Sequence, residues 1–188
     1  MNLLIFGIAL FAAVHLVSAV VPSAVASLKS AVGANGYRAV HAVLSLAGVA
    51  MIVIGWRSSV PVVVYAPPPW GMSVAFVLMF AAIYLIGASH GRLRIRRVVR
   101  NPQLTAVVLW AIAHLLANGD IRSIVLFTSL GAWALVEIAL LNRRDGEWHK
   151  PPAPSMKTEL IGAAIGIVVF LVLLALHPYF AGVSPLPA

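Results

Sequence analysis

Six apolar stretches separated by short polar loops make up most of this 188-residue chain. A helix that crosses a bilayer needs about 20 consecutive apolar residues, and most of the stretches approach that length. In lipid the backbone must satisfy its own hydrogen bonds, so each stretch is expected to be helical. The sequence therefore predicts an all-α fold, an integral membrane bundle of about six transmembrane helices. The predicted spans are residues 2–21, 39–56, 70–88, 102–118, 121–141 and 158–176.

Composition agrees with lipid as the main solvent and partner. Hydrophobic residues make up 62% of the chain and charged residues 10%, with a mean hydropathy of +1.00, outside the usual range of soluble domains. The net charge of +8 lies in short runs between apolar stretches rather than on a polar surface, so we expect no nucleic-acid partner. Cysteine is absent, which excludes disulfides, thiolate-bound metals and cysteine nucleophiles.

The basic residues are divided unevenly between the two faces that alternating spans would produce. The first, third and fifth loops carry eleven Lys and Arg residues, and the second and fourth carry two. Because short loops rich in Lys and Arg stay in the cytoplasm, we expect cytoplasmic basic loops and both termini on the outer face. The eleven are Lys29, Arg38, Arg92, Arg94, Arg96, Arg97, Arg100, Arg143, Arg144, Lys150 and Lys157, and the two are Arg57 and Arg122.

The fourth and fifth stretches are joined by only Gly119 and Asp120. A link of this length predicts an antiparallel hairpin. The alternative is a pair of helices that enters and leaves the membrane on the same side. In the last stretch, Gly162 and Gly166 are spaced for close contact between helices.

Three histidines fall within predicted spans: His15, His41 and His114. Ionisable groups are costly inside a membrane, which makes each a candidate functional residue. His15 and His114 are each flanked by small residues and one aromatic ring at helical spacing, and two such histidines could hold a flat macrocycle between helices. The neighbours of His114 at this spacing are Trp110, Ala111, Ala117 and Asn118.

Helical geometry leaves the pairing of these histidines open. At 1.5 Å per residue, His15 lies about 9 Å from the cytoplasmic end of its span and His114 about 18 Å from that of its own. Depth alone therefore pairs His15 with His41 at least as well as with His114. The simpler alternative is that each imidazole hydrogen-bonds a neighbouring helix and binds nothing.

Two charged residues could support a cofactor. Arg100, at the mouth of the fourth span, could neutralise a cofactor carboxylate. Glu137 could accept a hydrogen bond from the free ring nitrogen of His15, or it could simply reach the interface or pair with an arginine. Phosphate-binding glycine loops, zinc-protease motifs and nucleophile elbows are absent from the sequence. Any chemistry is therefore expected to be carried by a cofactor.

The central segment, residues 100–104 and 109–120, is the most specific motif of the sequence. Weaker motifs are Gly36-Tyr37-Arg38, Ala66-Pro67-Pro68-Pro69-Trp70, His177-Pro178 and Gly182-Val183-Ser184-Pro185. Taken in order along the chain, these motifs resemble those of the NnrU family of bacterial membrane proteins, which are linked to denitrification and related to the plant 15-cis-zeta-carotene isomerase. The resemblance implies a single NnrU-like transmembrane domain over residues 1–188 in the bacterial inner (cytoplasmic) membrane, with periplasmic N- and C-termini.

By resemblance, the protein is expected to bind haem b between His15 and His114, which are then its metal ligands. Trp110, Ala111, Asn118 and Arg100 would adjoin the cofactor. His41, where relatives usually have an aromatic residue, would line the pocket. Asn101 departs from the family's Arg-His-Pro triplet, and Ala111 stands where the plant isomerase has a cysteine associated with redox-dependent ligand exchange. That exchange cannot occur here in the same form.

Three hypotheses for function follow. The first is a haem-b protein with a redox or gas-ligand role in nitric oxide or nitrite metabolism. The second is an enzyme, a haem-dependent cis-trans isomerase of a carotenoid-like isoprenoid. The third is a membrane transport or assembly factor without haem that acts on a partner membrane protein. The sequence alone leaves the choice between an enzyme and a non-enzymatic protein open.

Overall fold

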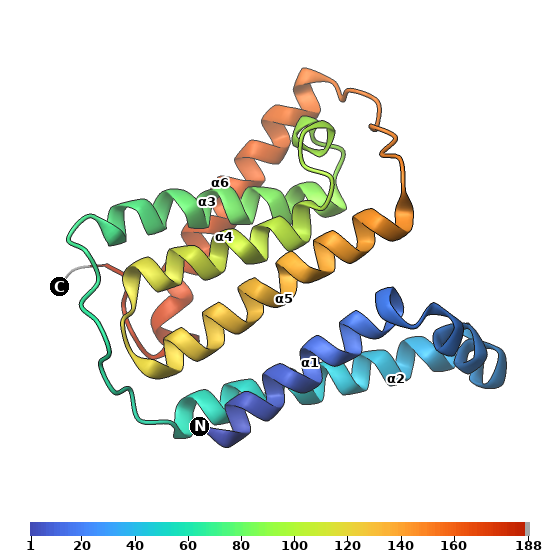
Figure 1. Ribbon diagram of the computed structural model, residues 1–188. Coiled ribbons are helices and arrows are strands. Elements are labelled where there is room, and N and C mark those ends of the chain that lie inside the picture. Colours follow the sequence, from blue (N-terminus) through green and yellow to red (C-terminus); the bar gives the residue numbers. More distant parts are fainter. Residues whose placement is uncertain (187–188) are drawn as a thin grey trace.

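Six α-helices and one 3₁₀-helix form the structure, a computed structural model that describes residues 1–186 (Figure 1). The expected domain, 1–188, includes two residues that lie outside the described part. Five helices are long and apolar enough to cross a membrane, and α4, with 16 residues, is shorter. The predicted all-α membrane bundle is confirmed. The helices are α1 (Asn2–Val20), α2 (Pro22–Ser58), α3 (Gly71–His90), η1 (Arg94–Arg97), α4 (Pro102–Ala117), α5 (Ile121–Asp145) and α6 (Met156–Ala181).

The second helix begins much earlier than the sequence predicted. We expected a span at 39–56 preceded by a loop, whereas α2 extends back to Pro22. Pro22 starts the helix, because proline suits the first helical turn. The helix is interrupted at Gly33, whose backbone (φ 76°, ψ 163°) lies outside the helical region and is readily adopted by glycine. The first loop is therefore two helical segments that meet at a kink.

Helices α1 and α2 form an antiparallel pair set to one side of the other helices (Figure 1). Glycines allow them to approach closely. A Cβ atom at Gly55 would collide with the backbone of Leu4, and a Cβ at Gly7 would lie 2.7 Å from the backbone nitrogen of Ile52. Helix α1 also packs against α5, and this contact joins the pair to the rest of the bundle.

Helix α4 packs between α3 and α5, whereas α6 packs mainly against α3 (Figure 1). Small buried residues bring these helices together: Ala82 of α3 and Ala106 of α4 are 1% and 0% exposed. Gly162 of α6 lies against Leu93. Most outward-facing side chains of the bundle are large, apolar and exposed, as contact with lipid requires. The length of α5, 25 residues, favours a spanning hairpin with α4 over a re-entrant pair.

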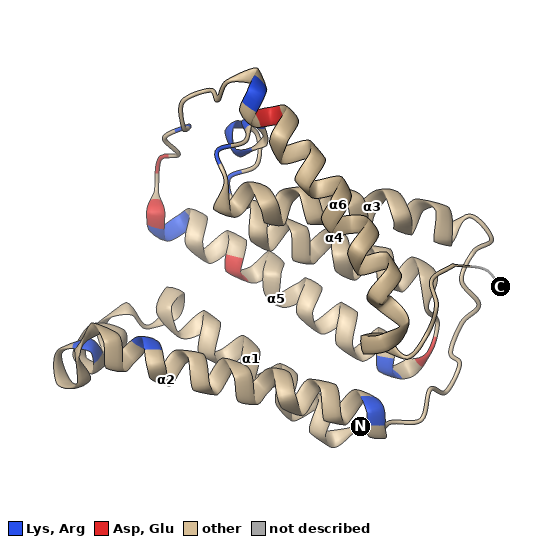
Figure 2. Cartoon of the chain, turned by 180° about the vertical axis from the view of Figure 1, so that it is seen from behind, with Lys and Arg blue, Asp and Glu red and all other residues tan. Residues whose placement is uncertain are grey.

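Apart from Glu137 inside α5, the charged residues gather at the two ends of the bundle (Figure 2). One end holds the loops with the eleven Lys and Arg residues, and we call it the basic end. The other holds the N-terminus and the C-terminal end of α6, together with Arg57 and Arg122, and we call it the terminal end. The alternation of loops deduced from six spans is therefore present in the fold.

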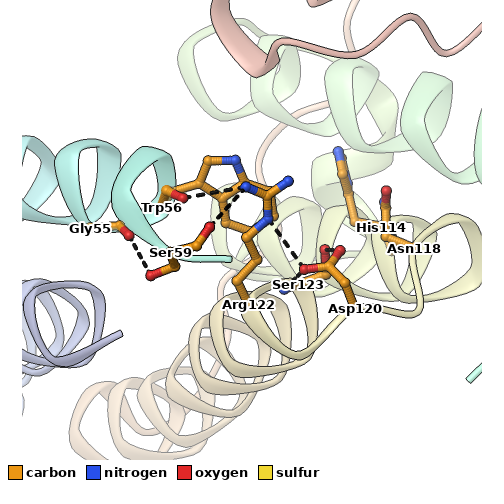
Figure 3. A network of polar contacts seen from close by, with 8 residues as sticks. All are labelled: Gly55, Trp56, Ser59, His114, Asn118, Asp120, Arg122 and Ser123. Atoms are coloured by element: carbon orange, nitrogen blue, oxygen red, sulfur yellow. Dashed lines mark hydrogen bonds and ion pairs between the residues drawn. The ribbon is translucent and has the colours of Figure 1, made fainter. Parts of the chain in front are cut away.

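At the terminal end, Arg122 joins the start of α5 to the end of α2 (Figure 3). Its guanidinium lies 4.4 Å from the centre of the Trp56 ring and forms a 3.3 Å ion pair with Asp120. It also donates hydrogen bonds of 3.4 Å to the carbonyls of Trp56 and Ser59. Asp120 in turn caps α5 by accepting from the backbone nitrogen of Ser123. Trp56, Ser59, Asp120 and Arg122 are called the Arg122 clasp below.

The loop between α2 and α3 crosses the turn between α4 and α5. Two of its backbone N–H groups donate to the Gly119 carbonyl, at 2.8 and 3.1 Å. The Tyr65 hydroxyl donates to the carbonyl of Asn118 at 2.9 Å and also to that of Leu115. Burial, with a contribution from the Asp120 carboxylate, raises the pKa of Tyr65, which keeps the hydroxyl protonated as a donor. The loop thereby fixes the terminal end of α4.

Candidate functional site

A cavity of about 1030 Å³ lies between the helices and is lined by residues of α1, α3, α4, α5 and α6. Ligand sites typically occupy about 300–1,000 Å³, so this one can hold a bulky cofactor. Its lining is largely apolar and includes the small residues Ala82 of α3 and Ala106 and Ala113 of α4. Small side chains allow a flat group to lie close to the helix backbones.

His15 lines the cavity from the second half of α1. Its Nδ1 is hydrogen-bonded to the carbonyl of Phe11 at 2.7 Å. The ring is held among Phe11, Trp133 and His41, with centre-to-centre distances of 4.1, 5.4 and 5.0 Å. Its orientation is therefore set by α1 itself, by α5 and by α2.

His114 lines the same cavity from the last turn of α4. Its Nδ1 is hydrogen-bonded to the carbonyl of Trp110 at 2.8 Å. The imidazole lies 4.5 Å from the ring of Phe127 and 5.1 Å from that of Trp110, both measured between centres. The orientation of the His114 ring is therefore set by α4 itself and by α5.

The two histidines share one feature that matters for metal binding. A carbonyl can only accept, so each Nδ1 carries the proton and each Nε2 keeps its lone pair. This is the tautomer in which an imidazole binds iron while its second nitrogen is anchored. In both cases the anchor is the backbone carbonyl four residues earlier in the same helix.

His15 and His114 face the cavity at different depths. Trp133 contacts His15 and Phe127 contacts His114, and these two aromatic residues are six positions apart on α5. At 1.5 Å per residue, that is about 9 Å along the helix, in agreement with the offset deduced from the sequence. The structure therefore brings the two histidines to one cavity without bringing their rings into contact.

We expected His41 to line the pocket, but the structure places it elsewhere. It is not among the cavity-lining residues, and it packs edge-on against His15 with 5.0 Å between ring centres. Two imidazoles that bind one metal from opposite sides, with bonds of about 2 Å, have centres about 6 Å apart. His41 therefore lies closer to His15 than the two axial ligands of one iron would.

The other expected cofactor neighbours divide into two groups. Trp110, Asn118 and Arg100 line the cavity, and Arg100 also donates to the Gly146 carbonyl at 2.8 Å. Ala111 does not line it. It is 3% exposed and belongs to the core that α4 forms with α1 and α5.

Two buried polar atoms in the cavity wall have no hydrogen-bond partner among the described residues. They are Nε1 of Trp133 and Oε2 of Glu137. Glu137 is 8% exposed, and it forms no ion pair with an arginine among residues 1–186. Nor does it accept from Nδ1 of His15, which donates to Phe11 instead. The two side chains lie one helical turn apart on α5 and near enough to interact with each other, so a ligand would compete with that contact.

Sequence reasoning missed two cavity residues. Arg96 lines the cavity at the basic end, whereas the sequence indicates only that its charge marks a cytoplasmic loop. His177 lines it from the end of α6, a helix end for which the sequence alone predicts no contact with the site. Its ring centre lies 6.4 Å from that of His114. The His177-Pro178 motif singled out His177, but proximity between helices is not visible in a sequence.

Groups of three or more His, Cys, Asp or Glu side chains placed to hold a metal ion do not occur among residues 1–186. A haem iron has different needs, because its macrocycle supplies four ligands and the protein supplies one or two. The donor set here consists of imidazoles at an apolar cavity with arginines at one end, which suits such a cofactor.

Comparison with known proteins gives one clear match. The sequence profile described as NnrU protein matches residues 3–185. No curated protein and no solved structure matches the chain. Because the match covers nearly the whole chain and contains both cavity histidines of α1 and α4, this membrane protein belongs to the NnrU family.

Proposed function

We propose that the protein binds haem b in the central cavity, with His15 and His114 as axial ligands, and serves a redox or gas-ligand role. The observation that carries the proposal is that both imidazoles line one large apolar cavity, each with Nδ1 hydrogen-bonded to a backbone carbonyl. Haem b bound there would supply an iron centre able to exchange an electron or to bind a small gas such as nitric oxide.

Each part of the cavity has a role in this proposal. Arg96 and Arg100 lie at its basic end, where their positive charges would pair with the carboxylates of the cofactor. Trp110 and Phe127 hold the His114 ring in place. The largely apolar lining favours a neutral gas over an ion as the ligand. The ring of Trp133 contacts that of His15, and its indole N–H can donate to a polar atom bound there.

The orientation of the protein is part of the proposal. We propose that it lies in a bacterial inner membrane with the basic end in the cytoplasm, because Lys and Arg concentrate there. Alkaline phosphatase, which is active only outside the cytoplasm, is expected to be active when fused after residue 186 and inactive when fused in the loop at residues 147–153. Equal activity of the two fusions would contradict this orientation.

The cofactor is tested by spectroscopy of the purified protein. Oxidised and reduced absorption spectra of the wild type, in detergent and with haemin supplied, are expected to show a Soret band of a six-coordinate, low-spin haem. His114→Ala is expected to weaken haem binding by at least about tenfold. His15→Ala is expected to change the electron paramagnetic resonance signal of the haem iron. His149→Ala, in an exposed loop, is the matched control.

The outcomes separate the hypotheses. A wild-type protein that stays colourless after haemin is supplied would contradict haem binding and favour a transport or assembly role. Wild-type spectra in both His15→Ala and His114→Ala would contradict the ligand assignment. Binding of carbon monoxide or nitric oxide to the reduced protein, read from the shift of the Soret band, would support the gas-ligand role.

A further inference from the structure

The imidazole nearest to His114 belongs to His177, near the C-terminal end of α6. Their ring centres are 6.4 Å apart and their planes differ by 23°. Two imidazoles bound to one metal from opposite sides have centres about 6 Å apart. The spacing of this pair is therefore close to that of two axial ligands, although His114 and His177 come from different helices and are 63 positions apart in sequence.

His177 is also in the right chemical form. Its Nδ1 is hydrogen-bonded to the carbonyl of Val183 at 2.8 Å, so Nδ1 carries the proton and Nε2 keeps its lone pair. The segment after α6 makes this contact possible, because Gly182 ends the helix with φ 78° and turns the chain back. His177 and Val183 both line the cavity that His15 and His114 line. Three anchored imidazoles thus face one space.

His15 and His177 differ in their distance from His114. His177 lies within 6.4 Å of the His114 ring, whereas His15 contacts α5 about 9 Å farther along the helix than His114 does. The His177 ring therefore has a centre-to-centre distance from His114 that two ligands of one metal would need, whereas the His15 ring would have to move toward His114 to reach the same metal. Both cannot occupy the same coordination position.

We propose that His177 is an alternative axial ligand, competing with His15 for the position opposite His114. This inference rests on the proposed binding of haem in the cavity. In this alternative, His177 in place of His15 would offer its Nε2 lone pair to the bound iron. No proton or electron would be transferred, because each ring would keep its proton on Nδ1. Helix α6 would then take part in the site directly.

The test uses the full-length protein loaded with haemin, with absorption and electron paramagnetic resonance as readouts. In His15→Ala, the iron is expected to stay six-coordinate and low-spin, because His177 fills the position. In the double variant His15→Ala with His177→Ala, it is expected to become five-coordinate and high-spin. The control is His15→Ala with His149→Ala, which is expected to behave like His15→Ala alone. Added imidazole should restore the low-spin state of the double variant, which shows that its cavity is folded.

Two results would overturn the inference while leaving haem binding intact. One is a high-spin iron already in His15→Ala, and the other is a double variant that stays low-spin without added imidazole. A wild-type protein without a Soret band would overturn both the inference and the proposed function. His177 is supported as the ligand if the iron is low-spin in His15→Ala and high-spin in the double variant, and if added imidazole returns the double variant to low spin.

Discussion

Replacing Gly55 with alanine is expected to separate α1 from α2 and to destabilise the protein by about 3 kcal/mol or more. The new Cβ would meet the backbone of Leu4, and a backbone atom cannot rotate away as a side chain can. One helix must therefore shift, and that shift disturbs the contact of α1 with α5 and the position of His15. Thermal unfolding of the purified protein, followed by size-exclusion chromatography after heating, measures the effect.

Gly87→Ala is the matched control for Gly55→Ala. Gly87 is also a membrane-helix glycine, in α3, but an added Cβ there meets nothing within 4 Å. Alanine is favoured over glycine inside a helix by about 0.5–1 kcal/mol, so this variant should be as stable as the wild type or more stable. If Gly55→Ala also kept wild-type stability, the close packing of α1 on α2 described above would be wrong.

Replacing Arg122 with glutamine is expected to release the pair α1 and α2 from the terminal end of α5. The change removes the cation–π contact with Trp56, the ion pair with Asp120 and the hydrogen bonds to the end of α2. The side chains of Arg122 and Asp120 are 18% and 15% exposed, so solvent compensates only in part. We expect a loss of about 1–3 kcal/mol of unfolding free energy, measured by the same thermal assay.

Arg57→Gln provides the comparison, since Arg57 is an exposed arginine at the same end of the bundle. It should leave the unfolding temperature unchanged, because exposed charges contribute little. A double variant of Arg122→Gln with Trp56→Leu tests the clasp further. Its destabilisation should be smaller than the two single effects combined, because both variants remove one shared contact. Strict additivity would show that Arg122 and Trp56 act independently.

The membrane fold was predictable from sequence because each helix satisfies its own backbone and each apolar stretch has the length that lipid demands. The unequal numbers of Lys and Arg in the loops likewise predicted how the basic residues divide between the two ends of the bundle (Figure 2). The kink at Gly33 was not predictable in the same way. A glycine between two helix-forming segments suits a loop as well as a kink, and only the observed φ of 76° distinguishes them.

The candidate site was predictable only in part. Histidines within apolar stretches identified His15 and His114, and the structure places both at one cavity. His177 was missed because it lies near the end of α6, where a sequence suggests contact with solvent. Only the packing of α6 shows that its ring faces His114. Ala111 was selected by helical spacing from His114, but spacing alone does not tell which flank of a helix faces a cavity and which faces a neighbour.

The cavity is bordered by helices of unequal length. Helix α4 has 16 residues and α6 has 26, which correspond to about 24 Å and 39 Å against a hydrocarbon core of about 30 Å. A short span draws the bilayer thinner and a long one tilts, so the two walls respond to lipid in opposite senses. We therefore expect a change in lipid acyl-chain length to change the distance between His114 and His177 at the ends of these two helices.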